Sequence, residues 1–101
     1  MKEPTFDKDG YPTEETLRTI REWKIKDMES ARELINFCRG MWYWPKLAPY
    51  KNGRYEFHTG GWSGNESIIE AMQDNHLFWL LCWLESRRGG HYKFDLKGIP
   101  E

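Results

Sequence analysis

Large apolar and polar side chains alternate along residues 55–59 (YEFHT), and they alternate again along residues 91–96 (HYKFDL). An alternation with a period of two is typical of a strand with one buried face. The chain between these two strands is long enough for two helices, so that strand, helix, helix and strand run alternately up and down. This order predicts that the two strands are antiparallel neighbours in one sheet, and it decides the fold.

One register of these strands gives favourable cross-strand pairs throughout. It places His58 opposite His91, Phe57 opposite Tyr92, Glu56 opposite Lys93 and Tyr55 opposite Phe94. Aromatic pairs and pairs of opposite charge each contribute about 0.2–1 kcal/mol to a sheet. The four aromatic residues then share the face that packs on the helices. The other face, towards water or a ligand, carries Glu56, His58, His91, Lys93 and Asp95.

Two helices are predicted between the strands. Ser63 and Glu66 have the spacing of a capping box, and apolar residues follow at helical spacing until Asn75. The next segment, residues 76–88, is apolar on every side over residues 77–84, which is typical of a buried helix with its tryptophans in the core. The same run also fits a buried strand, but its leucines and the RRGG sequence that ends it favour a helix.

The first half of the chain is predicted to be helical after an irregular lead-in at residues 1–12. Thr13 has the chemistry of an N-cap ahead of two glutamates. The apolar stripe over residues 13–39 allows two helices or one continuous helix. In the first case Asp27 caps the second helix and Gly40 ends it.

Residues 41–54 contain two prolines and the hairpin turn signal Asn52-Gly53. Residues 42–44 (WYW) fit a short edge strand, because Pro45 ends any central one. The predicted fold is therefore one α+β domain over residues 1–101. It has N-terminal helices and a small antiparallel sheet, with a helical pair inserted between the two main strands of that sheet.

The composition excludes several classes of protein. The 101 residues include 15 basic and 16 acidic side chains, and the formal net charge of −1 argues against coating nucleic acid through bulk charge. No apolar run approaches the roughly 20 residues that span a bilayer, and residues 1–4 (MKEP) start no secretory signal. We therefore expect a cytoplasmic protein with no membrane partner, and we expect Cys38 and Cys82 to be buried, reduced thiols.

Two glycine-rich segments are expected to meet at one end of the sheet, because one follows the first strand and the other precedes the second. The candidate ligand-binding residues there are Gly60, Gly61, Trp62, Ser63, Gly64, Asn65, Arg87, Arg88 and His91. The N–H groups of a helix N-terminus suit a phosphate, arginine binds phosphate in a bidentate manner, and tryptophan stacks on a base. The alternative is that the glycines form only turns and caps, and Glu66 competes for the same N–H groups.

The two histidines that face each other suggest a different function. His58 and His91, with Glu56 and Lys93 beside them, have the groups for acid–base cleavage of a phosphodiester. The alternative is an ordinary pair of surface histidines beside a cross-strand ion pair. No spacing of His, Cys, Asp or Glu matches a metal motif, so neither a metal nor a cofactor is expected.

Three large aromatic residues in a row, Trp42, Tyr43 and Trp44, cannot all point inward. An exposed tryptophan or tyrosine beside prolines is a common anchor for a protein partner. The segment is therefore a candidate contact surface, with a packed core segment as the alternative. A homo-oligomer is also compatible with the sequence, since small ligand-binding proteins often complete a pocket across a symmetric interface.

Several strings resemble a known family. Residues 59–66 (TGGWSGNE), residues 88–92 (RGGHY), Phe78-Trp79 and Trp83 look like those of a family of small uncharacterised proteins of tailed phages and prophages. The resemblance covers roughly residues 42–94 and brings no activity or catalytic residue. It implies a viral setting in the host cytoplasm, where small accessory proteins often counter host defence.

Three functions are therefore predicted. The leading one is a non-enzymatic phage accessory protein that binds a nucleotide-like, phosphate-bearing ligand and sequesters a host immune signal. The alternative is an inhibitor that docks on a host defence protein through residues 42–44. The third is an RNase-like enzyme that uses the paired histidines.

Overall fold

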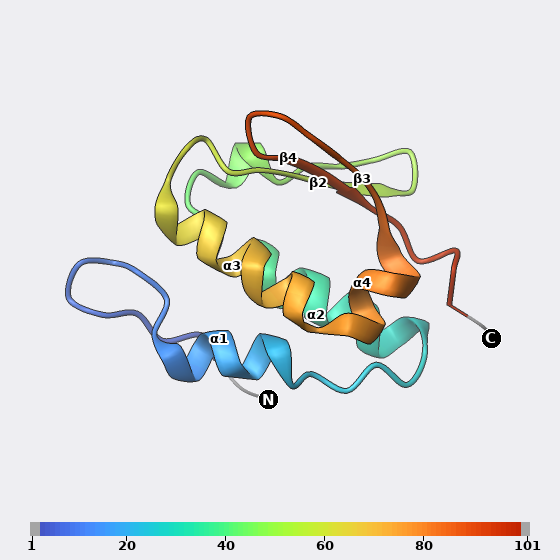
Figure 1. Ribbon diagram of the computed structural model, residues 1–101, viewed down its shortest axis with the longest axis horizontal. Helices are drawn as coiled ribbons and strands as arrows, with labels where there is room; N and C mark the ends of the chain where they lie inside the picture. The colour runs from blue at the N-terminus through green and yellow to red at the C-terminus, as the bar shows by residue number, and fades with distance from the viewer. Residues whose placement is uncertain (1–2, 100–101) are drawn as a thin grey trace.

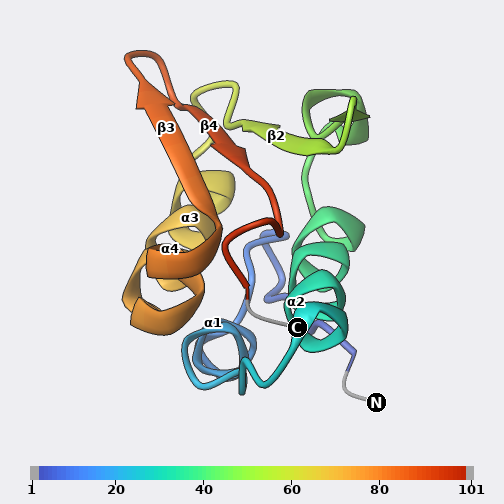
Figure 2. The same cartoon turned by 90° about the vertical axis from the view of Figure 1, so that its right-hand side faces the viewer.

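The chain folds into two layers, a sheet and a set of helices that lie along one of its faces (Figures 1 and 2). The computed structural model describes residues 3–99, so Met1 and Lys2, which entered the expectation about a secretory signal, lie outside the described residues. The helices are α1 (Glu14–Arg21), α2 (Met28–Gly40), the 3-10 helix η1 (Pro45–Leu47), α3 (Ser63–Asp74) and α4 (His76–Cys82). The strands are β1 (Tyr50–Lys51), β2 (Arg54–His58), β3 (Trp83–Arg87) and β4 (His91–Phe94). The predicted α+β class is confirmed.

The sheet has the strand order β1-β2-β4-β3, and its neighbouring strands are antiparallel. The register of β2 and β4 is the predicted one, with His58 opposite His91 and Tyr55 opposite Phe94. In β2 the side chains of Tyr55 and Phe57 are buried, whereas their neighbours along the strand are more exposed. The helices lie beneath this buried face. The opposite face, called the open face below, points away from α1–α4 (Figure 2).

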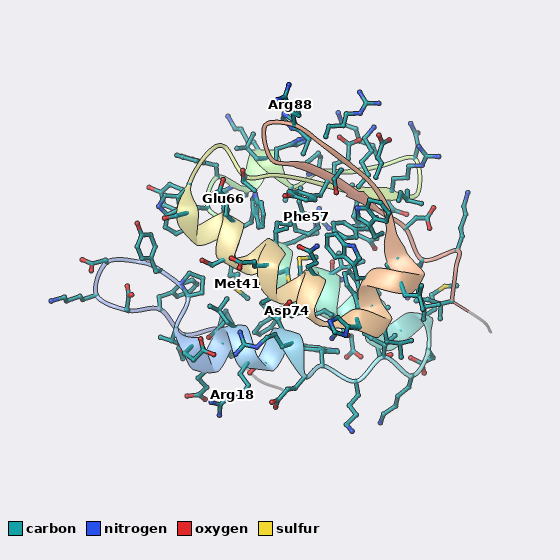
Figure 3. The ribbon with its side chains drawn as sticks, viewed as in Figure 1. Arg18, Met41, Phe57, Glu66, Asp74 and Arg88 are labelled. Atoms are coloured by element: carbon teal, nitrogen blue, oxygen red, sulfur yellow. The ribbon has the colours of Figure 1, made fainter. Side chains whose placement is uncertain are left out.

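Aromatic side chains from the sheet and the helices form the centre of the core. Phe57 packs edge-on against Phe94 with 5.7 Å between ring centroids, and the ring of Phe78 in α4 lies 5.5 Å from that of Phe94. All three side chains are fully buried, and Figure 3 shows Phe57 between the sheet and the helices. Burying one such ring stabilises a fold by about 1.5–3 kcal/mol, so this cluster holds β2 and β4 on the helical layer.

The N-terminal helical region consists of two helices. Thr13 caps α1 as predicted, since its hydroxyl oxygen accepts a hydrogen bond from the backbone N–H of Thr16. Asp27 caps α2 and forms a capping box with Ser30. Gly40 is the last residue of α2, so the predicted end of this helix is correct to within one residue. The separate caps decide between one helix and two, because each cap residue has extended backbone geometry.

The prediction of one helix over residues 76–88 is wrong in its second half. Helix α4 ends at Cys82, and the following residues form β3, which pairs with β4. Gly89 and Gly90 have φ values of 88° and 79°, and this left-handed backbone turns the chain back into a hairpin instead of capping a helix. As a result Trp83 is 41% exposed and stacks on Trp79, where a core position was expected.

Three smaller predictions are also wrong. The N-cap residue of α3 is Trp62, and because no side chain caps this helix, the capping box of Ser63 and Glu66 does not form. Residues 42–44 form a loop after α2 and not an edge strand. Asp95 is buried just beyond β4 and does not lie on the open face. Its backbone N–H donates a hydrogen bond to the carbonyl oxygen of Cys82, the last residue of α4.

Both cysteines are buried free thiols, as predicted. Burial raises the pKa of the Cys82 thiol to about 12, and burial raises the pKa of the Cys38 thiol as well. Neither side chain is therefore a reactive thiolate near neutral pH. Among residues 3–99, no helix has both the length and the hydropathy needed to cross a bilayer.

Candidate ligand-binding corner

The two glycine-rich segments lie side by side at the end of the β2–β4 pair. The backbone N–H of Thr59 donates a hydrogen bond to the carbonyl oxygen of Gly90 at 2.9 Å. A Cβ atom on Gly90 would lie 2.1 Å from the hydroxyl oxygen of Thr59, so only glycine permits this approach. The structure thus brings together the loop after β2 and the β3–β4 hairpin. We call residues 59–65 and 87–91 the corner.

Four aromatic side chains form a continuous row along the first of these segments. The distances between ring centroids are 5.1 Å from Tyr11 to Trp62, 4.7 Å from Trp62 to Tyr43 and 4.6 Å from Tyr43 to Trp44. Tyr11, Tyr43 and Trp44 are 40%, 49% and 46% exposed. We call these four residues the aromatic row. It offers flat ring surface to a base or to an apolar side chain of a partner.

Two glycines make room for rings of the aromatic row. A Cβ atom on Gly60 would lie 2.8 Å from the Trp44 ring, and a Cβ atom on Gly64 would lie 2.2 Å from the Trp62 ring. The Trp62 indole therefore lies against the first turn of α3, where a phosphate at the helix N-terminus was expected. The arginines of the corner are better placed than the helix N–H groups to bind a phosphate.

Trp42 and Trp44 have different roles although they are close in sequence. Trp42 is buried, packs edge-on against Phe57 and donates its Nε1–H to the carbonyl oxygen of His58 at 3.0 Å. The expectation that Trp42 contacts a partner is therefore wrong. Trp44 has a left-handed backbone with φ 61° and ψ 78°. Such a conformation costs of order 1–3 kcal/mol and is found preferentially at functional positions.

Asn65 supports the corner from the inside. Its side chain is fully buried, and its Nδ2 donates to the carbonyl oxygens of Tyr43 at 3.1 Å and Thr59 at 3.2 Å. Its Oδ1 accepts a hydrogen bond from the backbone N–H of Tyr43 at 3.0 Å. The amide of Asn65 thus positions the aromatic row, and it is not exposed for the ligand contact that the sequence predicted.

The hairpin side of the corner is positively charged. Arg88 lies at the outer end of the β3–β4 hairpin, far from Arg18 on α1 (Figure 3). Arg87 pairs with His91 across the hairpin, so both lie on the open face. Arg87 donates its Nε–H to Glu85 at 3.0 Å, and this hydrogen bond holds the pKa of Glu85 below its ordinary value. Arg88 is exposed in the turn and is accessible to an anion from solution.

His58 and His91 contact each other at the same end of the sheet. Their Nδ1 atoms are 2.6 Å apart, at hydrogen-bond distance, and Nε2 of His58 lies 3.2 Å from Oε1 of Glu56. The structure therefore brings the predicted acid–base groups together. The two rings bind each other, however, whereas in-line displacement at phosphorus places the attacking and leaving oxygens on opposite sides. The RNase-like alternative requires the rings to separate first.

Two hollows of the surface lie away from the corner. The larger has a volume of about 1060 Å³ and is lined by α1, the loop that follows it and the first half of α2. The smaller has a volume of about 200 Å³ and is lined by residues of α2, β1, β2 and the segment after β4. Neither hollow is lined by the glycine-rich segments.

No family model, curated protein or solved structure matches this chain. The resemblance to small phage proteins therefore stays a prediction.

Three residues beside these surfaces were missed from the sequence. Tyr11 stacks on Trp62 and its hydroxyl accepts a hydrogen bond from Ser63, but nothing in the sequence links two segments so far apart. Lys51 and Arg54 are opposite each other in the paired strands β1 and β2, on either side of the Asn52-Gly53 turn, and they extend the open face. These two could have been found, because the alternation of β2 continues back to Arg54.

Proposed function

We propose that this protein binds a nucleotide-like, phosphate-bearing ligand at the corner. The observation that carries the proposal is the hydrogen bond between Thr59 and Gly90, because it joins the segment of Trp62, which contacts two other rings of the aromatic row, to the hairpin that bears the arginines. Aromatic rings provide a stacking surface for a base, and arginine provides bidentate donors for a phosphate. The corner has both kinds of group at one end of the sheet.

In this complex the base stacks on an exposed ring of Tyr43 or Trp44, and the phosphate binds Arg88. The Trp44 ring lies over Gly60, next to Thr59, and His91 follows Gly90. The ring therefore contacts the residue after Thr59, and the imidazole belongs to the residue after Gly90.

The proposed activity is binding without turnover. Mutual hydrogen bonding of the two histidines favours a binding role over acid–base catalysis at this end of the sheet. A protein of this kind removes a nucleotide from solution. In a phage, which is the setting that the resemblance implies, such a ligand would be a host immune signal.

Calorimetric titration with mononucleotides, cyclic dinucleotides and short oligonucleotides tests the proposal. We expect at least one of these ligands to bind, and we expect Arg88→Gln to weaken its binding by roughly 10-fold or more, since a hydrogen bond to a charged group contributes about 1.5–3 kcal/mol. Arg18→Gln is the matched control, because Arg18 lies far from the corner (Figure 3). Binding of none of the ligands, or equal affinity of the Arg88 variant and the wild type, would overturn the proposal.

One observation favours a second candidate, a protein partner that docks on the aromatic row. Trp44 is held exposed in a left-handed backbone, and exposed tryptophans are frequent binding anchors. This candidate predicts a partner that is captured by the wild type and lost with Trp44→Gly, a change that suits the left-handed backbone. It also predicts that Arg88→Gln leaves capture unchanged, which separates it from the nucleotide proposal.

A further inference from the structure

The open face of the sheet concentrates positive charge in a chain whose net charge is −1. Strand pairing places Lys51 beside Arg54 at one end of this face and Arg87 beside His91 at the other. Lys93 lies between the two ends, opposite Glu56 on one side and Glu85 on the other. With Arg88 at the hairpin tip, the basic side chains of this surface are Lys51, Arg54, Arg87, Arg88 and Lys93.

The carboxylates of the open face already have partners within the sheet. Glu85 accepts a hydrogen bond from Arg87 at 3.0 Å and lies 3.6 Å from Nζ of Lys93. Glu56 contacts His58 at 3.2 Å. The basic side chains at the ends of the face are exposed, so they are accessible to solvent ions or to a ligand. These side chains are Lys51, Arg54 and Arg88.

These cations are too far apart for one phosphate group. Arg54 and His58 lie four positions apart in β2, which corresponds to about 13 Å at roughly 3.3 Å per residue. The arginines of the hairpin lie near His58, because His58, His91 and Arg87 are successive partners across the sheet. A ligand that satisfies both ends must therefore carry several phosphates in a row.

From this charge distribution we propose that the ligand is a single strand of nucleic acid, several nucleotides long, that lies along the open face. The inference rests on the proposed function and deepens it. Phosphates of the strand bind Arg88 at one end and Arg54 and Lys51 at the other, while Arg87 and Lys93, which contact Glu85, add positive charge between them. A base at the hairpin end stacks on the aromatic row, which distinguishes this ligand from an acidic peptide. The positive charge is confined to this face, so such binding is compatible with a net charge of −1, which argues against coating nucleic acid through bulk charge.

Fluorescence anisotropy with labelled oligothymidylates and oligouridylates of two, four and eight nucleotides tests this inference. We expect the eight-nucleotide strands to bind about tenfold or more tightly than the dinucleotides. The logarithm of the binding constant should fall with the logarithm of salt concentration with a slope of about −2, as for roughly three phosphate contacts at −0.7 each. Arg54→Gln should weaken binding of the eight-nucleotide strand severalfold and leave dinucleotide binding unchanged, while the control Arg18→Gln changes neither.

The outcomes separate this inference from the proposed function. If dinucleotides and longer strands bind equally and Arg54→Gln has no effect, the extended site is wrong and the binding corner stands. If no nucleotide of any length binds, both are wrong. If polyglutamate competes fully and Trp44→Gly leaves binding of the strand unchanged, the open face binds acidic chains in general and the nucleic-acid assignment is overturned.

Discussion

The backbone nitrogen of Thr59 lies 2.9 Å from the carbonyl oxygen of Gly90, and this hydrogen bond joins two residues that are 31 positions apart in the chain. It extends the β2–β4 pairing beyond His58 and His91. Because of it, the loop that carries Trp62 and the hairpin that carries Arg88 lie at one end of the sheet. The corner therefore depends on how closely these two backbones approach.

Replacing Gly90 with alanine is expected to open the corner and to destabilise the fold. Gly61 is a matched control, because both glycines have a φ of 79° but a Cβ atom on Gly61 meets nothing within 4 Å, whereas one on Gly90 lies 2.1 Å from the Thr59 hydroxyl oxygen. Both variants lose stability because alanine is strained in a left-handed backbone. In Gly90→Ala the added Cβ atom also overlaps the Thr59 side chain. We expect Gly90→Ala to lose about 1–3 kcal/mol more than Gly61→Ala in urea unfolding. Equal losses would contradict the close approach.

Gly64→Ala tests the position of the Trp62 ring. Alanine within a helix normally stabilises a protein by roughly 0.5–1 kcal/mol relative to glycine, and the control Gly40→Ala in α2 should show no loss, since a Cβ atom there meets nothing within 4 Å. A Cβ atom on Gly64 displaces the Trp62 ring, so we expect a loss of stability and a shift in tryptophan fluorescence. A gain of stability in both variants would show that the ring does not cover α3.

The cap of α2 predicts part of the acid sensitivity of the fold. Hydrogen bonds from Ser30 hold the pKa of Asp27 below its ordinary value. A carboxyl group of this kind contributes stability that is present above its ordinary pKa, near 3.9, and that is lost as the pH falls through the lowered value. Asp27→Asn keeps a capping residue, so urea midpoints should fall less between pH 6 and pH 2.5 in this variant than in the wild type. An unchanged pH dependence would contradict the lowered pKa.

The contact between the two histidines predicts the absence of RNA cleavage. Because the Nδ1 atoms of His58 and His91 bind each other at 2.6 Å, neither ring is placed for acid or base work on opposite sides of a phosphorus atom. Incubation of the wild type with RNA between pH 5 and pH 8 should give no more cleavage than incubation of the His58→Ala variant. Cleavage that depends on His58 would restore the RNase-like alternative.

The strand register could be predicted from the sequence because two constraints agree. Alternation assigns each side chain of β2 and β4 to a face, and only one register then pairs both aromatic and oppositely charged residues. The N-caps at Thr13 and Asp27 could also be predicted, because capping depends on residues within one turn. Capping within one helical turn and cross-strand pairing were sufficient to make these predictions.

The hairpin of β3 and the interior of the corner could not be predicted in the same way. An apolar run with no alternation fits a buried helix as well as a strand, and the choice depends on pairing with β4. Asn65 has an ordinary polar side chain in the sequence, and its role depends on carbonyl groups of Tyr43 and Thr59 that only the fold brings near. The register of β2 and β4 predicts that the glycine-rich segments converge. It does not predict that the Trp44 and Trp62 rings lie against Gly60 and Gly64.

NMR titration with a dinucleotide, followed through the amide and indole signals, is the sharpest test of the binding corner. We expect the shifts to concentrate on residues 59–65 and 87–91, with the indole N–H signals of Trp44 and Trp62 among the largest. Signals from α1 and the large hollow beside it should not move. Shifts confined to that hollow, or no shifts at saturating ligand, would show that the corner is not the binding site.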